Sequence, residues 1–349
     1  MATMEAYTAN NTLKPEASMK KTRLLKAFSL AAMALACCVA LAACGGQAAT
    51  SNGGSTPASA NQQVIIGTMA TEDILPMWVA EQEGLFTEAG VNATVQVFQS
   101  AQELSTALAS GAVNMAMTDA QVSATLQAGG VNMVMEWVTL GSTASQGRFG
   151  IMTSPASGIT SLEQLAGVPI GVGSNTVPEY VMDKLMERAG VATDQVVSEE
   201  IKKLPVRYEM MTSNQVAAAA LPASMLALGE ATGMVLLADD TTGENISQSV
   251  MAARADWAQS NAETIKKLKD VWNAAVKEIN EDPEKYRALL VEKASLPEAV
   301  AQTYPISTYP EAEYPTNAMI DPVLDWMLEK GYLTSALTYD QTTGAFQKA

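Results

Sequence analysis

The chain has 349 residues, of which 48% are hydrophobic, a length that accommodates two domains with a substantial core. Its formal net charge of −16 argues against holding nucleic acid or an anionic lipid surface by charge. It contains no histidine, the commonest general base and zinc ligand, so the composition argues against hydrolytic triads and zinc sites, and no cofactor is expected.

An apolar segment near the N-terminus has the features of a secretory signal peptide. A basic stretch beginning at Met19 precedes an apolar run that ends in Leu41-Ala42-Ala43-Cys44. This ending resembles the bacterial lipoprotein box, whose cysteine is lipidated and becomes the mature N-terminus. We expect residues 1–18 to precede the true start at Met19, a signal peptide over 19–43, and a lipid on Cys44. An ordinary signal peptide or a signal anchor is the alternative.

The next segment, residues 44–62, is composed mostly of Gly, Ser, Ala, Thr and Asn without apolar periodicity. This composition is typical of a flexible tether, which reaches roughly 20–25 Å from its anchor. Cleavage before Cys44 also removes Cys37 and Cys38, so neither a disulfide nor a catalytic thiol is expected in the mature chain.

Strands and helices alternate from residue 64 to residue 140. Short apolar runs bounded by glycine or polar residues predict strands, and one of the helices between them opens with the capping-box pattern Ser100-Ala-Gln-Glu103. This alternation is typical of a largely parallel sheet flanked by helices, which is the α/β class. The strands are expected at 64–67, 93–98, within 110–119, and at 133–140.

Two ten-residue segments share one design. Ser110–Asp119 and Ser213–Pro222 both read Ser-(Gly/Asn)-x-Val-x-x-Ala, with a helical run before and another after. The repeat predicts two similar lobes, and a chance match is the alternative. Ligands of open α/β sheets lie beyond the carboxyl ends of the strands, so each segment should end at a shared cleft. The residues expected there are Thr118, Asp119, Leu221 and Pro222.

Two polar segments, 141–150 and 239–248, predict crossovers between the lobes that act as a hinge. We expect residues 63–146 in lobe I, 147–246 in lobe II, and 247–349 returning to lobe I as a helical region.

The C-terminal region begins with an apolar stripe from Ile265 to Ile279 at helical spacing, which indicates core packing. Tyrosine-proline pairs at Tyr304, Tyr309 and Tyr314 favour an extended segment. Packing of this segment on lobe I is expected, and an aromatic edge to the cleft is the alternative. A last helix is expected over 323–330.

Several short motifs occur in the order found in a known family. They are Leu75-Pro76-x-x-Val79-Ala80-x-x-x-Gly84-Leu85-Phe86-x-x-x-Gly90-Val91, Ala107-Leu108-x-x-Gly111, and Leu165-Ala166-Gly167-x-Pro169-Ile170-Gly171. The chain resembles the solute-binding lipoproteins of ABC importers in the nitrate, sulfonate, taurine and thiamine-pyrimidine group. The resemblance implies a two-lobed α/β fold of the type II periplasmic-binding-protein class, with a mostly parallel sheet in each lobe. It also implies a monomer that binds a small molecule between the lobes and docks on a membrane permease driven by a cytoplasmic ATPase.

The resemblance suggests ligand loops in both lobes. Residues 174–180 look like the family's second-lobe ligand loop, and residues 71–73 occupy the place of the first. Together with Ser100 and the cleft residues above, the candidate ligand-binding residues are Thr71, Glu72, Asp73, Ser100, Thr118, Asp119, Ser174, Asn175, Thr176, Tyr180, Leu221 and Pro222.

The charges of these loops suggest the character of the ligand. Residues 174–176 precede a helix whose first N–H groups are unpaired, a site that favours an accepting or anionic group. Glu72, Asp73 and Asp119 would repel a small anion, unless they only favour or cap the starts of their own helices. We expect a small, polar, nitrogen-containing organic solute.

Two other classes of function remain open. An enzyme of the related thiamine-pyrimidine type consumes an active-site histidine, which this chain lacks. The sequence of one chain is also compatible with a ligand sensor or a surface adhesin. A permease and an ATPase encoded nearby would distinguish an importer component from these two.

Overall fold

The computed structural model describes residues 63–143, 145–242 and 246–348, which lie in one compact unit, Thr56–Ala349. The predictions for residues 1–62, namely the start at Met19, the signal peptide, the lipidated Cys44 and the tether, lie outside the described residues. No helix in the described part is long and apolar enough to cross a membrane.

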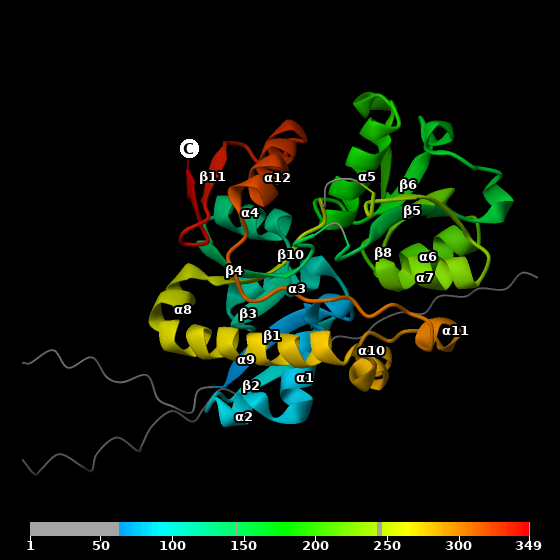
Figure 1. The fold of residues 1–349 in the computed structure, drawn as a ribbon. Coiled ribbons are helices and arrows are strands. Elements are labelled where there is room, and N and C mark those ends of the chain that lie inside the picture. Colours follow the sequence, from blue (N-terminus) through cyan, green and yellow to red (C-terminus); the bar gives the residue numbers. More distant parts are fainter. Residues whose placement is uncertain (1–62, 144, 243–245, 349) are drawn as a thin grey trace, which may run out of the picture. The chain divides into compact units, whose positions relative to one another are not determined.

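The described strands form two separate sheets (Figure 1). The seven-stranded sheet of lobe I has the order β11-β12-β4-β10-β3-β1-β2, and the five-stranded sheet of lobe II has the order β7-β6-β8-β5-β9. The lobe I strands are β1 (Val64–Met69), β2 (Ala93–Phe98), β3 (Met115–Thr118), β4 (Met133–Leu140), β10 (Ser249–Arg254), β11 (Leu337–Asp340) and β12 (Ala345–Lys348). The lobe II strands are β5 (Phe149–Thr153), β6 (Pro169–Val172), β7 (Val197–Glu200), β8 (Ala218–Pro222) and β9 (Val235–Asp239).

Five strands of lobe I and the five strands of lobe II follow the same order. β1 pairs in parallel with β2 and β3, as β6 does with β7 and β8. The strand that follows each crossover, β5 in lobe II and β10 in lobe I, runs antiparallel to both of its neighbours. The expected two-lobed α/β fold is confirmed, but both sheets are mixed where mostly parallel sheets were predicted.

Helices cover both faces of each sheet. In lobe I, α1, α9 and α10 share one core and α3, α4 and α12 share the other; in lobe II, α5 lies on one face and α6 with α7 on the other. The predicted stripe of α9 is buried along its whole length. The helices are α1 (Leu75–Glu83), α2 (Leu85–Glu88), α3 (Ala101–Ser110), α4 (Ala120–Ala128), α5 (Val177–Arg188), α6 (Leu204–Thr212), α7 (Ala223–Ala231), α8 (Ala255–Ser260), α9 (Ala262–Glu281), α10 (Arg287–Lys293), α11 (Glu298–Ala301) and α12 (Asn317–Glu329).

The sequence repeat marks equivalent places in the two lobes. Gly111 follows α3 and Asn214 follows α6, and both adopt left-handed backbone with φ of 78° and 56°. Glycine and asparagine tolerate this conformation better than other residues. The valine two residues on is buried in each case, Val113 before β3 and Val216 before β8. The predicted pair of α-turn-β units is confirmed.

The C-terminal region differs from the helical prediction. Beyond Gly331 the chain forms the hairpin β11-β12, which joins the edge of the lobe I sheet through β4. Leu337 and Tyr339 are buried while Thr338 between them is exposed, a period of two that favours a strand. The last helix, α12, also begins earlier than predicted, at Asn317.

The hairpin turn sits tightly against the sheet at Gly344. Its carbonyl oxygen accepts a hydrogen bond from the backbone N–H of Met135 at 2.8 Å. A Cβ at this position would collide with the carbonyl oxygen of Met135 and lie 2.9 Å from the ring of Tyr314. Gly331, which has a similar φ of 77°, has nothing within 4 Å of the corresponding position.

We predict that Gly344→Ala lowers the free energy of unfolding more than Gly331→Ala does. Both changes place a Cβ on left-handed backbone, which costs about 1–2 kcal/mol. Gly344→Ala must also displace β4, and such overpacking costs roughly 1–3 kcal/mol more. Urea denaturation of both variants measures the difference, and equal losses would contradict the described docking of the hairpin.

Candidate functional site

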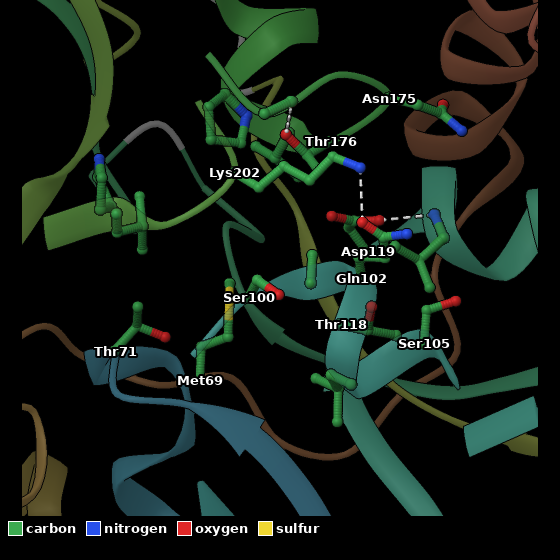
Figure 2. A pocket seen from close by; sticks show the side chains of 18 of the residues that line it. Met69, Thr71, Ser100, Gln102, Ser105, Thr118, Asp119, Asn175, Thr176 and Lys202 are labelled. Carbon is green, nitrogen blue, oxygen red and sulfur yellow. Dashed lines mark hydrogen bonds between the residues drawn. The ribbon is translucent and has the colours of Figure 1, made fainter. Parts of the chain in front are cut away.

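A cavity of about 320 Å³ lies where the loops after the strands of the two lobes meet. Its lobe I wall comes from the ends of β1, β2 and β3, and its lobe II wall comes from the ends of β6, β7 and β8. Figure 2 shows Thr71, Ser100, Thr118 and Asp119 facing Thr176 of the other lobe across this space. This volume lies at the lower end of the range for small-molecule sites, about 300–1,000 Å³.

Most of the predicted site residues contribute to the cavity wall. The nine that do so are Thr71, Asp73, Ser100, Thr118, Asp119, Ser174, Asn175, Thr176 and Pro222. Their contact with a ligand stays a prediction.

Three candidates, Glu72, Tyr180 and Leu221, lie outside the wall. The side chain of Glu72 points the other way and accepts a hydrogen bond from the hydroxyl of Tyr304 at 2.8 Å. Tyr180 packs edge-on against Trp326 with ring centroids 5.2 Å apart, within a core of lobe I. Leu221 is fully buried in the core between the lobe II sheet and its helices. The prediction identified the segments that reach the cavity, but it did not foresee that these three side chains point away from it.

Tyrosine hydroxyls bind Glu72 from the Tyr-Pro segment. Besides the bond from Tyr304, the hydroxyl of Tyr309 donates to the backbone carbonyl of Glu72 at 2.8 Å. Both rings are buried in a core of lobe I. Packing of the Tyr-Pro segment on lobe I is therefore confirmed, and these two rings do not edge the cavity.

Burial raises the pKa of both carboxyl groups after β1. The pKa of Glu72 rises to about 7, because burial and the neighbouring Asp73 outweigh the hydrogen bond from Tyr304. Burial also raises the pKa of Asp73, whose carboxylate accepts a hydrogen bond from the hydroxyl of Ser249. Loss of solvation disfavours the charged form of a carboxyl group. The repulsion that these residues exert on an anion is correspondingly reduced.

Asp119 caps a helix, which was the structural alternative for this residue. Its Oδ1 accepts the backbone N–H of Val122 in the first turn of α4 at 2.7 Å. The backbone N–H of Val177, at the start of α5 in lobe II, bonds to the same carboxylate. Burial raises the pKa of Asp119 to about 6 against the effect of these two bonds. The carboxylate thus accepts N–H groups from the starts of two helices, one in each lobe.

The backbone N–H groups before α5, which were expected to attract the ligand, donate hydrogen bonds to carboxylates of the protein itself. The backbone N–H of Ser174 donates to Glu200 at 2.8 Å, and that of Asn175 donates to Glu179 at 2.6 Å. The side-chain amide of Asn175 donates across the lobes to the hydroxyl of Thr125 at 2.6 Å. In this arrangement the start of α5 binds the protein's own acceptors rather than offering free donors.

The end of β7, the loop after it and the start of α6 supply cavity residues that the sequence analysis missed: Glu200, Lys202, Leu204 and Arg207. The ammonium of Lys202 donates across the lobes to the side-chain carbonyl of Gln102 at 2.6 Å (Figure 2). The missed loop is the lobe II equivalent of the loop that carries Ser100, since β7 and β2 occupy the same place in their sheets. Extending the repeat by one strand would have pointed to it.

Away from the cavity, α5 of lobe II meets α12 of lobe I (Figure 1). The ammonium of Lys330 lies 3.3 Å from Glu179 Oε1 and 2.9 Å from Asp183 Oδ2. The indole N–H of Trp326 donates to Asp183 at 2.8 Å, and the hydroxyl of Tyr332 donates to Glu179 at 2.7 Å. We call these five residues the α5–α12 contact.

Residues 71–286 of the chain match the model of a family described as NMT1/THI5 like. The chain belongs to this family. The match begins at the first cavity loop, runs through lobe II and all of α9, and ends at Tyr286, immediately before α10 of lobe I. A comparison with curated proteins finds no match.

Solved structures share the fold at low sequence identity. The alkanesulfonate-binding protein SsuA of Xanthomonas axonopodis pv. citri, solved with MOPS, is 16% identical over 80% of this chain and 96% of its own, with a TM-score of 0.68. The periplasmic nitrate-binding protein NrtA of Synechocystis PCC 6803 is 13% identical over 78% and 82%, with a TM-score of 0.66. The desulfurization enzyme DSZB is 13% identical over 79% and 94%, with a TM-score of 0.58.

These comparisons confirm the predicted family group and the type II periplasmic-binding-protein fold. The fold is shared by binding proteins and by an enzyme, so it does not by itself decide the activity.

The buried carboxyl group of Glu72 predicts a pH dependence of stability. Its pKa is about 7 in the folded protein against 4.5 ordinarily, so between these values the folded state holds its proton more tightly than the unfolded state. The free energy of unfolding should therefore fall as pH rises from about 4.5 to about 7. Glu72→Gln should flatten this fall, which urea denaturation at a series of pH values measures.

Tyr304→Phe is the matched control for this experiment. It removes a hydrogen bond that lowers the pKa of Glu72, so the fall in stability should persist and extend to higher pH. A pH profile for Glu72→Gln as steep as that of the wild type would show that Glu72 is not the group responsible.

Proposed function

We propose that the protein is an extracytoplasmic solute-binding lipoprotein of an ABC importer. It captures a small organic solute between its lobes and delivers it to a membrane permease with a cytoplasmic ATPase. The observation that carries the proposal is the cavity, whose wall comes from equivalent loops of two lobes joined by two crossovers. Family membership and the fold of the sulfonate- and nitrate-binding proteins support it.

Binding without chemical turnover is the activity that we propose. The protein has no histidine, and its described residues hold no group of three or more potential metal ligands. The lobe I carboxyl groups at the cavity, Asp73 and Asp119, are engaged by Ser249 and by the starts of two helices, and Glu200 of lobe II is engaged by Ser174. Carboxyl groups that are fixed by hydrogen bonds within the protein suit a role in shaping a binding site rather than in transferring protons.

The crossovers give the proposal a mechanism. Residues 141–148 join β4 to β5 and residues 240–248 join β9 to β10, so the lobes are linked by these two segments and by contacts across the cavity. A ligand that touches both walls stabilises the closed arrangement by its differential affinity for it. The predicted nitrogen-containing ligand would place its donor end toward Asp73 and Asp119.

We predict that a bound solute both raises the melting temperature and reduces the radius of gyration of the full-length chain. A thermal-shift screen of sulfonates, nitrate, amino acids, pyrimidines and vitamins identifies binders, because binding stabilises the folded state by RT ln(1 + [L]/Kd). Small-angle scattering with the best binder then measures closure. Thermal stabilisation without compaction would contradict capture by lobe closure, and no binder at all would contradict solute binding.

We further predict that Cys44→Ala releases the protein from the membrane with its solute binding intact. Stable anchoring requires more than one acyl chain, and the modified cysteine of a lipoprotein supplies them. Fractionation after salt and carbonate washing measures release, with Cys37→Ala as the control that should stay bound. A Cys44→Ala variant that remains with the membrane would contradict lipidation at this residue.

A further inference from the structure

Among the described residues that line the cavity, one carries a guanidinium group, and the sequence analysis did not single it out. Arg207 lies in the first turns of α6, is only 2% exposed, and lines the cavity from the lobe II side. Arginine is rarely buried to this extent without a partner of opposite charge. What this side chain binds therefore needs an explanation.

Two backbone carbonyls hold the guanidinium in place. Its Nε donates to the carbonyl of Ile201 at 2.9 Å, and its Nη1 donates to the carbonyl of Ala220 at 3.0 Å. The remaining nitrogen, Nη2, receives no hydrogen-bond acceptor from the described residues. It passes over the end of β6 at Gly173, where a Cβ would lie 2.7 Å from it. Glycine at this position leaves room for the guanidinium to reach the cavity.

The charge of Arg207 is not balanced by an ion pair in the described part of the chain. Its attraction to Glu200 is too weak to offset the effect of burial, which lowers the pKa of Arg207 to about 10, so the group remains charged at neutral pH. Glu200 itself accepts hydrogen bonds from the backbone N–H and the hydroxyl of Ser174 and lies 3.7 Å from the ammonium of Lys202. A buried cation without a close counter-charge is unfavourable, and an anion in the cavity would relieve this.

The rest of the wall fits an organic acid with an apolar body. Apolar side chains make up much of it on both sides, among them Met69, Met117 and Val122 of lobe I and Leu204 of lobe II. The two lobe I carboxyl groups at the cavity have raised pKa values and partners of their own, so they oppose an anion less than free carboxylates would.

We propose that Arg207 anchors the anionic group of the ligand, so that the protein selects a small organic acid, a carboxylate or sulfonate with an apolar body. This rests on the proposed solute-binding function and names the chemical class that the cavity takes. Nη2 and the open side of the guanidinium donate to the acid oxygens, while Ile201 and Ala220 fix its orientation. A guanidinium suits this task because its planar fork matches the geometry of such groups.

The test compares acids with neutral analogues of the same shape. Calorimetry on the full-length chain uses hexanoate against hexanamide and hexanesulfonate against hexanesulfonamide. The wild type should bind at least one acid and bind its amide much more weakly. Arg207→Gln should weaken the binding of that acid by about 30-fold or more, as expected for removing one partner of a buried charged pair. Arg188→Gln, at the exposed end of α5, should leave the affinity unchanged.

Gly173→Ala is a second variant that tests the same role in case Arg207→Gln does not fold. It keeps the charge but crowds Nη2, so it should also weaken acid binding. Circular dichroism and melting temperature establish that each variant is folded.

The two proposals fail in distinguishable ways. Equal binding of an acid by the wild type and a folded Arg207→Gln, or equal binding of an acid and its amide, would overturn the role of Arg207. Binding restricted to neutral or cationic solutes of the wider screen would overturn it as well, but would leave solute binding intact. The absence of any binder would contradict both.

Discussion

A carboxylate that is removed from water must find donors, and this requirement shapes the meeting of the two lobes. Asp119 illustrates it most clearly, because it takes one N–H from the start of α4 and one from the start of α5. Glu179 is likewise buried and accepts the N–H of Asn175 in the loop before α5, while the exposed Glu200 accepts the N–H of Ser174 in the same loop. The carboxylates of the acidic loops thus accept the hydrogen bonds that the helix starts donate, and the cavity lies between these paired segments.

This mutual pairing explains why Arg207 is the distinctive group of the cavity. The acidic side chains have donors within the protein, whereas among the described residues the guanidinium has two carbonyls as acceptors and a carboxylate, Glu200, that attracts it without forming an ion pair. Backbone carbonyls satisfy hydrogen bonds but do not neutralise a charge. The strongest unmet electrostatic demand in the cavity is therefore for an anion, although the protein as a whole carries a net charge of −16.

Much of the architecture could be predicted from the sequence, since apolar runs and turn residues identify the strands and loops that build the cavity. β7 was missed because its Val-Ser-Glu-Glu sequence is polar and largely exposed, so it has no apolar run to detect. Lys202 and Arg207 were lost with it. Side-chain direction was the other limit: Glu72 and Asp73 are adjacent, yet one turns to Tyr304 and the other to the cavity. Such choices depend on distant parts of the chain, here a tyrosine 232 positions away.

The α5–α12 contact allows lobe closure to be changed separately from ligand recognition, two properties that a binding site usually combines. None of its five residues lines the cavity, yet it joins the lobes as the contacts beside the cavity do. Apparent affinity scales with the fraction of molecules already in the competent arrangement. A change at Trp326 or Asp183, unlike one at Glu179, which also binds the cavity residue Asn175, would multiply the affinity for every solute by one common factor and leave their ranking untouched. Evolution, or an engineer who builds a sensor on this scaffold, can thus adjust the concentration range at α12 without redesigning recognition.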